Sequence, residues 1–140
     1  MPTYDGQCHC GALAFHYHTA VPPERWQLRA CQCSFCRRHA ALFTSDPGGR
    51  LEFGAREAHA LRRYRFGLRT ADFLLCTRCG VYLGAQIATG SGSFGIINAR
   101  ALAAIPEALP SASPVSYQAE DAAQRLARRA ERWTPLAVML

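Results

Sequence analysis

Hydrophobic and polar residues alternate along several short stretches of this chain. Between residues 11 and 20, Leu13, Phe15 and Tyr17 alternate with smaller or polar side chains. A period of two predicts a strand with one apolar face. Shorter stretches of the same character are residues 26–30, 42–44, 51–53, 72–75, 81–83 and 94–98. The pattern therefore predicts a mainly β fold.

One helix is predicted near the C-terminal end, at about residues 117–133. Ser116 is the expected N-cap, and Leu126 and Trp133 fall on one face. Acidic residues lie near its start and arginines near its end, which matches the helix dipole. Pro135 is expected to end the helix.

The length of 140 residues predicts a single domain, residues 1–140, with a core of its own. No apolar run is long enough to span a membrane. The first residues lack the basic start and apolar stretch of a signal peptide. We therefore expect a cytoplasmic protein, in which thiols stay reduced and clustered cysteines bind metal more often than they form disulfides.

The seven cysteines of the chain all belong to three clusters. An odd number does not suit a framework of disulfides, whereas a division into four and three suits two metal sites. Thiolates are soft ligands, and zinc is the common divalent ion that accepts several of them. The clusters are Cys8 with Cys10, Cys31 with Cys33 and Cys36, and Cys76 with Cys79.

The first and third clusters together supply four ligands. Cys8 and Cys10, placed at i and i+2 of a strand, would present their sulfurs on the same side. Cys76 and Cys79 form a knuckle followed by Gly80, a residue that permits a tight turn. Two thiols from each cluster together predict a closed, structural zinc site. The competing interpretation is a set of buried, reduced thiols.

The remaining trio, Cys31, Cys33 and Cys36, supplies only three ligands. A zinc ion with three protein ligands and an open fourth position is typical of a catalytic site, where it holds a thiolate or polarises a carbonyl. Two alternatives stay open: His39 could complete a second structural site, or the trio could be a redox centre. The fourth ligand distinguishes them.

The net charge of +6 overstates the basic character of the chain. Seven thiolates subtract seven charges and two zinc ions add four, which leaves +3 and argues against nucleic-acid binding. Arg37 and Arg38 follow the trio directly. They would favour thiolates and attract an anionic substrate, unless they are a solvated or ion-paired couple.

Three further groups of residues have simpler explanations. His16 and His18 share a strand face and are best explained as facing solvent. Asn98 ends an apolar run and is expected to bond a loop backbone or touch substrate. A solvated face, rather than a phosphate or nucleic-acid site, is favoured for Arg62, Arg63, Arg65 and Arg69.

The thiol motifs resemble those of the glutathione-dependent formaldehyde-activating enzymes, a family that includes centromere protein V-like domains. The matching stretches lie within residues 5–103. They are Cys8–Gly11, Cys31–Arg38, Cys76–Gly80 and the apolar run that ends in Asn98. The family commonly has a glycine after the two arginines, where this chain has His39, Ala40 and Ala41. That difference affects the lip of the expected pocket.

The resemblance implies a zinc-bearing β-tent fold made mainly of antiparallel sheets. It implies two zinc ions per chain, one structural on Cys8, Cys10, Cys76 and Cys79 and one catalytic on Cys31, Cys33 and Cys36. The implied activity is that of a carbon–sulfur lyase that joins formaldehyde to glutathione, giving S-hydroxymethylglutathione. The alternative is a non-catalytic zinc module for protein or nucleic-acid binding. The sequence leaves homo-oligomerisation open.

Overall fold

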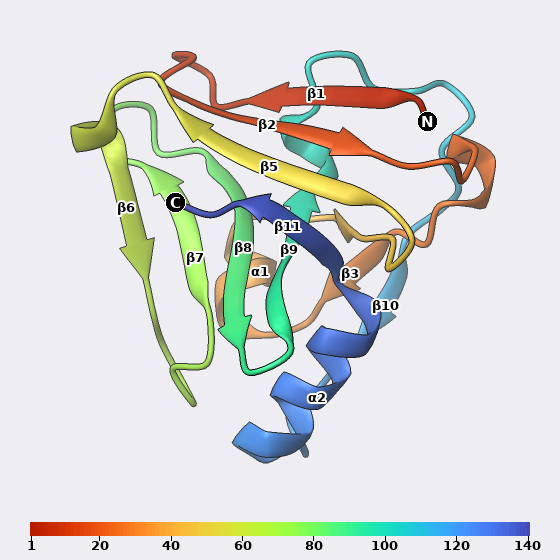
Figure 1. Ribbon diagram of the computed structural model, residues 1–140, viewed down its shortest axis with the longest axis vertical. Coiled ribbons are helices and arrows are strands. Elements are labelled where there is room, and N and C mark those ends of the chain that lie inside the picture. Colours follow the sequence, from red (N-terminus) through yellow and green to blue (C-terminus); the bar gives the residue numbers. More distant parts are fainter.

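The computed structural model describes residues 1–140 and consists mainly of strands, as predicted (Figure 1). Its helices are α1 (Ser34–Arg38) and α2 (Ala122–Arg132). Its strands are β1 (Thr3–Gln7), β2 (Leu13–His18), β3 (Arg29–Cys31), β4 (Phe43–Thr44), β5 (Arg50–Ala55), β6 (Leu61–Tyr64), β7 (Asp72–Cys76), β8 (Tyr82–Thr89), β9 (Gly92–Asn98), β10 (Ser113–Val115) and β11 (Thr134–Val138).

The strands form two groups that meet at β11. One group has the order β1-β2-β5-β11. In the other, β9 pairs with β8 and β4, and the sheet continues to β6 on one side and to β10 on the other. Figure 1 shows β1, β2 and β5 running across the upright strands β6–β9. Most pairs are antiparallel, while β11 pairs in parallel with β5 and β10 with β3. The predicted β-tent class is confirmed.

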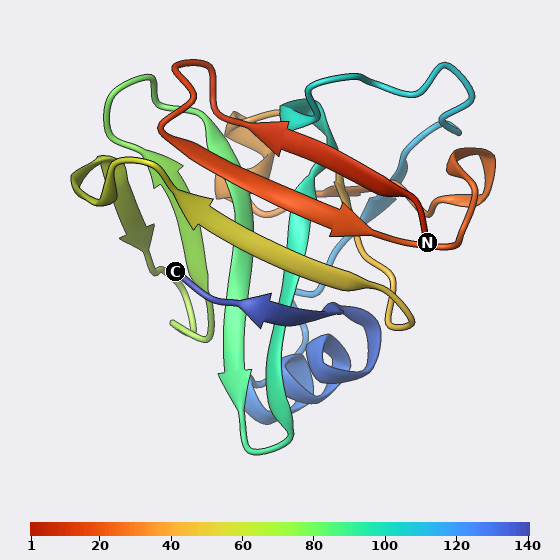
Figure 2. The ribbon, with the colours of Figure 1, turned by 45° about the horizontal axis from the view of Figure 1, so that its top comes forward.

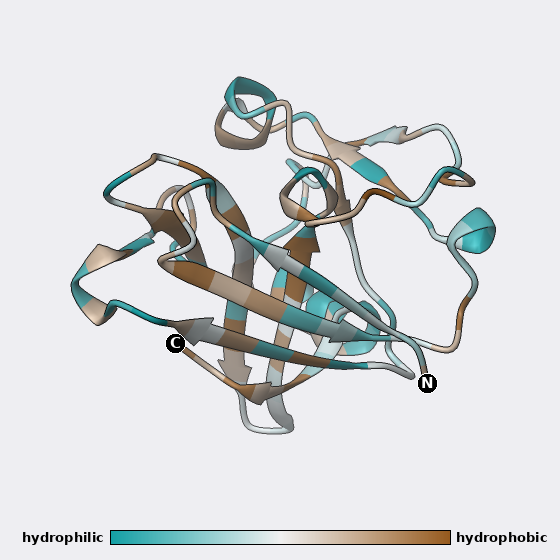
Figure 3. Cartoon of the chain, turned by 90° about the horizontal axis from the view of Figure 1, so that it is seen from above, coloured by the Kyte–Doolittle hydropathy of each residue, from teal (hydrophilic) through white to brown (hydrophobic).

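The alternation seen in the sequence builds the core between the two groups. Phe15 and Tyr17 of β2 lie opposite Phe53 and Leu51 of β5, and all four side chains are buried. Each such side chain contributes roughly 1.5–3 kcal/mol when it leaves water. The other sheet adds buried apolar side chains such as Leu83. Figure 3 shows the resulting alternation of hydrophobic and hydrophilic segments along the strands.

The C-terminal helix is confirmed, but it begins later than predicted. Helix α2 starts at Ala122 with Asp121 as its N-cap, so the prediction that Ser116 caps it is wrong. Asp121 accepts a hydrogen bond from the Gln124 N–H at 2.8 Å, and the Gln124 side chain accepts one from the Asp121 N–H at 2.9 Å. This reciprocal capping box satisfies two amides at once, which a serine at 116 could not do.

Pro135 does not end the helix, because α2 already stops at Arg132. Trp133 is the C-cap, and the chain turns at once into β11 (Figure 2). Pro135 lies within this strand, opposite Phe94 of β9. The strand starts at the end of the helix, so the position of α2 is fixed by a strand that belongs to both sheets.

Candidate metal centres and cavity

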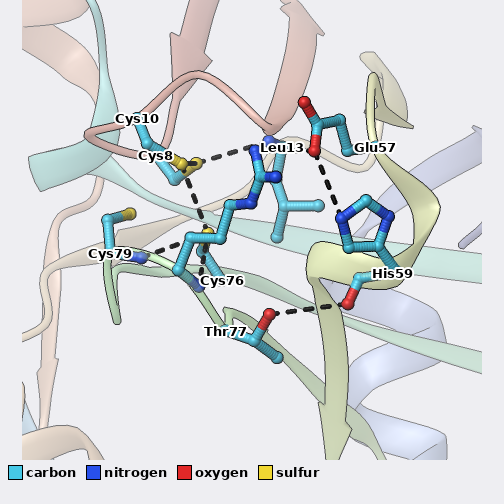
Figure 4. Close-up of polar contacts among 9 residues, drawn as sticks. Cys8, Cys10, Leu13, Glu57, His59, Cys76, Thr77 and Cys79 are labelled. Atoms are coloured by element: carbon cyan, nitrogen blue, oxygen red, sulfur yellow. Dashed lines mark hydrogen bonds and ion pairs between the residues drawn. The ribbon is translucent and has the colours of Figure 1, made fainter.

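Four cysteine sulfurs meet where the turn after β1 packs against the turn after β7 (Figure 4). The Cys10 sulfur lies 3.7 Å from that of Cys8 and 3.6 Å from that of Cys76. With Cys79, all four lie within 4.8 Å of one another. A tetrahedron with Zn–S bonds of ~2.3 Å has sulfur–sulfur edges of about 3.8 Å, whereas disulfide sulfurs are about 2.05 Å apart. The spacing fits a metal ion.

Two glycines shape these turns. Gly11 and Gly80 have φ angles of +80° and +78°, a conformation that side chains other than glycine rarely adopt. Their N–H groups donate to the carbonyls of Cys8 and Cys76, which closes each turn around its thiols. The expectation that Cys8 and Cys10 belong to a strand is wrong: β1 ends at Gln7 and both cysteines lie in the turn that follows.

Protonation within this cluster is uneven. The backbone amide of Ala12 favours the Cys10 thiolate, but burial and the neighbouring thiols outweigh it and raise the pKa of Cys10 to about 11. Burial opposes ionisation of Cys79, yet backbone and thiol hydrogen bonds lower its pKa to about 6. The Leu13 N–H also donates to the Cys8 sulfur at 3.3 Å. Four sulfurs this close can all be thiolates only around a cation.

The second group, Cys31, Cys33 and Cys36, lies where β3 runs into α1. Its sulfurs also lie within 4.8 Å of one another. Cys33 is the N-cap of α1, and its sulfur accepts a hydrogen bond from the Cys36 N–H at 3.3 Å. Cys36 is buried, whereas Cys31 and Cys33 are partly exposed. The short helix therefore holds the trio with one side open.

The three thiols share their protons. Hydrogen bonds from Cys31 and then Cys36 lower the pKa of Cys33 to about 2. The hydrogen bond to Cys33 raises the pKa of Cys31, and hydrogen bonds to Cys31 and then Cys33 raise that of Cys36, because each of these thiols acts as the donor. The cluster therefore favours one anion at Cys33, and a cation would be needed for three.

His39 does not join the trio. Its ring packs against Phe35, with ring centroids 4.6 Å apart, and lies 5.6 Å from the ring of Tyr82. The cluster of potential ligands at this place contains cysteines alone. The alternative in which His39 completes a second structural site is therefore wrong, since aromatic packing holds the imidazole elsewhere.

A cavity of about 580 Å³ opens beside the trio. This volume is within the range of small-molecule sites. Cys31, Cys33 and Cys36 all line the cavity, while none of the four cysteines of the other cluster does. Aromatic side chains form part of the wall, including Phe66 and Phe73. The two thiol clusters thus differ in access: one faces a cavity and the other ties two turns together.

Helix α2 supplies the opposite wall, which sequence reasoning missed. Arg125, Arg128 and Arg129 of α2 line the cavity, as do the C-cap Trp133 and, before the helix, Tyr117. From the sequence, Arg128 and Arg129 are expected only to complement the helix dipole, and Arg125 is assigned no role. The spacing of 125, 128 and 129 on one helix face is the signal that could have found them.

Arg37 and Arg38 lie differently. Arg37 lines the cavity, whereas the Arg38 guanidinium donates to the Ser34 carbonyl at 3.0 Å and is not among the residues around the cavity. The geometry therefore favours Arg37 over Arg38 as a group that meets an anionic substrate.

The histidines and Asn98 have structural partners. His16 lies 2.6 Å from the Asp5 carboxylate, and His18 lies 3.2 Å from that of Glu52. Asn98 is buried, accepts from the N–H groups of Leu42 and Arg100 and donates to the Tyr82 carbonyl. Asn98 therefore makes hydrogen bonds to backbone groups, including one in the loop before β4, which is one of the two roles expected for it.

The predicted arginine patch is partly engaged. Arg63 donates to the Leu140 carbonyl, Arg65 pairs with Asp72 at 2.6 Å, and Arg62 lies over the ring of Tyr64. All four arginines are exposed, which agrees with a solvated face. Neither helix is long and apolar enough to cross a bilayer.

Comparison with known proteins identifies the family. The model for glutathione-dependent formaldehyde-activating enzymes matches residues 3–117. A crystal structure of a protein from Rhodobacter sphaeroides superposes with a TM-score of 0.58 and 29% identity, over 79% of this chain and 99% of that one. No curated protein matches the chain. Because the family model covers most of the sequence, including all seven cysteines, this chain belongs to the glutathione-dependent formaldehyde-activating enzyme family.

Proposed function

We propose that this protein is a zinc-dependent carbon–sulfur lyase that adds the thiol of glutathione to formaldehyde. In this reaction the sulfur bonds to the aldehyde carbon, the carbonyl becomes a hydroxyl, and the thiol proton ends on that oxygen. The product is S-hydroxymethylglutathione or a related adduct. Family membership supports the substrate pair, and the trio at the cavity supports the place where they meet.

The two thiol clusters would divide the work. Cys8, Cys10, Cys76 and Cys79 would hold a structural zinc in a closed, four-sulfur shell, and Cys31, Cys33 and Cys36 would hold a catalytic one. Bound there, zinc supplies a Lewis acid and a partner for a substrate thiolate. Free thiols must stay reduced for this, which is consistent with the proposed location in the cytoplasm.

The chain itself contributes position and charge. A cavity walled by Phe66, Phe73 and Trp133 brings two small reactants together and limits access of water. Arg37 on the rim adds positive charge where the thiol must lose its proton. No covalent intermediate with a side chain is required.

The observation that carries this proposal is that three thiols, and no fourth protein ligand, face the cavity. A closed site would argue for a non-catalytic module. The experiment is exchange NMR of the glutathione–formaldehyde adduct at equilibrium, with wild type, Cys33→Ser and an Arg132→Gln control. Wild type and the control should accelerate exchange above the buffer rate, and Cys33→Ser should not. Equal rates for wild type and Cys33→Ser would refute the proposal.

A further inference from the structure

The wall of the cavity formed by α2 lies outside the region shared with the family, which ends at residue 117. Four arginines line the cavity, namely Arg37, Arg125, Arg128 and Arg129, and Glu120 is the one acidic residue among its lining groups. The charge on this wall is therefore strongly positive, and its chemistry belongs to this chain rather than to the shared motifs.

Two of the four arginines already have a carboxylate partner. Both Glu120 carboxylate oxygens accept hydrogen bonds from Arg128, at 2.8 and 3.1 Å. The Nε of Arg125 lies 3.5 Å from the same carboxylate. Arg128 also lies over the Tyr117 ring, 3.4 Å from its centroid. This arrangement holds the side chains of Arg125 and Arg128 against Glu120, which precedes the helix.

Arg129 has no such partner, although it is buried. Its side chain keeps only a small exposed fraction, the residue as a whole being 8% exposed. Its Nη1 donates to the Thr70 hydroxyl at 2.8 Å, and its guanidinium lies over the Trp133 ring, 4.8 Å from the centroid. Neither contact carries negative charge. Burial accordingly lowers the pKa of Arg129 to about 10.

The same wall holds two buried donors without acceptors. The Nε of Arg129 and the Nε1 of Trp133 make no hydrogen bond, and both residues line the cavity. Buried N–H groups and a buried charge without a counter-ion cost free energy, and an acceptor bound in the cavity would lower that cost. Every orphan atom here is a donor, which points to a ligand that only accepts.

We propose that Arg129 determines substrate specificity by binding a carboxylate of the substrate, with Trp133 beside it. The planar guanidinium matches a carboxylate in a two-pronged pair, which a point charge does not reproduce. This inference rests on the proposed function, and it names the part of the thiol substrate that the cavity recognises. Arg129 would therefore select a thiol that carries a carboxylate over a neutral thiol, which lacks the group that Arg129 binds.

Calorimetric titration of the protein as purified tests this assignment. The first probe is S-methylglutathione, which keeps both carboxylates but has no free thiol. The second is its diethyl ester, which lacks them. We expect wild type to bind the acid at least tenfold more tightly than the ester. Arg129→Gln should weaken binding of the acid by about 10- to 100-fold, the range for a hydrogen bond to a charged group, and leave the ester unchanged.

Two variants serve as controls. Arg129→Lys keeps the positive charge but not the planar guanidinium. Its affinity for the acid should lie between those of wild type and Arg129→Gln. Arg132→Gln removes an exposed arginine of the same helix that does not line the cavity, and it should bind both probes as wild type does. If Arg129→Gln does not fold, the acid–ester comparison on wild type and on Arg129→Lys still decides the question.

Three results would overturn the inference. Wild type could bind acid and ester alike, it could bind neither at millimolar concentration, or Arg129→Gln could lose zinc and weaken both probes equally. The last result would make Arg129 a counter-charge for the thiol trio. Because S-methylglutathione cannot react with formaldehyde, a failure of catalysis in the exchange experiment would leave this binding result intact, and the two proposals fail separately.

Discussion

The sulfur of Cys10 lies 3.6 Å from the sulfur of Cys76, although the two residues are 66 positions apart in the chain. This contact joins the turn after β1 to the turn after β7. A shared metal ion would restrict the unfolded chain as a cross-link does. For a loop of this length, the entropy lost by the unfolded chain would stabilise the fold by about 4 kcal/mol. Removal of one of these thiols should therefore destabilise the fold and not only lower the activity.

Cys76→Ser should unfold or aggregate the protein, because it opens the four-sulfur cluster that ties the two turns together. Cys33→Ser should leave a folded protein, since the trio lies on a single short segment at a cavity wall. Thermal melts followed by circular dichroism compare the two. Equal melting temperatures for both variants would contradict the division into structural and catalytic sites.

Wild type purified without chelator should contain up to two zinc ions per chain, released in two phases. The trio is open to the cavity and should lose its metal first, with the fold retained. The four-sulfur site should release metal only as the fold melts. Stepwise chelator addition with a zinc indicator and parallel circular dichroism measures this. A protein without zinc and with seven freely reactive thiols would refute the metal assignment.

Ala40→Gly should stabilise the protein. Ala40 follows α1 with a φ of +48°, a left-handed conformation that costs an L side chain about 1 kcal/mol relative to glycine. Relief of that cost should outweigh the greater freedom of glycine in the unfolded chain. We expect the melting temperature to rise by about 1–2 °C, measured by differential scanning fluorimetry.

The neighbouring Ala41→Gly is the matched control. Ala41 is buried and does not have a positive φ, so glycine there brings no relief and removes a packed methyl group. It should lower stability by about 1 kcal/mol. A rise in melting temperature for Ala41→Gly, or a fall for Ala40→Gly, would show that strain at residue 40 is not the cause.

Glu120→Gln should remove part of the acid sensitivity of the protein. The hydrogen bond from Arg128 lowers the pKa of Glu120 in the folded state. The carboxylate therefore contributes stability above its unfolded pKa of about 4.3, and that contribution is lost as pH falls through the lower folded value. Urea unfolding should show that the free energy of unfolding of wild type exceeds that of Glu120→Gln by about 1 kcal/mol at pH 6. This difference should shrink below pH 4.

Glu131→Gln provides the comparison for this experiment. Glu131 lies on the same helix but is exposed and makes no ion pair. Its replacement should change stability little at either pH. An advantage of wild type over Glu120→Gln that stays constant from pH 6 to pH 3 would rule out the ion pair with Arg128 as its source.

The two cysteine clusters could be predicted from the sequence because the spacing of potential ligands is a local property. Cys31 ends β3, Cys33 caps the short helix α1 and Cys36 lies in it, so their spacing almost dictates their proximity. The alternation around Phe15 likewise marked a buried strand face. The pairing of the remaining four cysteines needed only one assumption, that thiols gather where a metal can hold them.

One local signal was overlooked, and two features that depend on distant parts of the chain were missed. Asp121 and Ser116 are both good capping residues, and only the reciprocal bond with Gln124 favours Asp121. Pro135 was interpreted as a helix stop, although its strand forms through pairing with β5 and β9. The proposed role of Arg129 could not be predicted, because the trio that lines the same cavity lies more than ninety residues earlier.

Strand β11 has a consequence for the order of folding. The hairpins β1–β2 and β8–β9 close through neighbouring residues, whereas β11 must find β5, where Leu136 lies opposite Leu51. Pairings between distant residues form slowly because a long loop must close first. We expect the two sheets to form before β11 joins them. Helix α2 leads directly into β11, so the cavity would gain its arginine wall in the last step of folding.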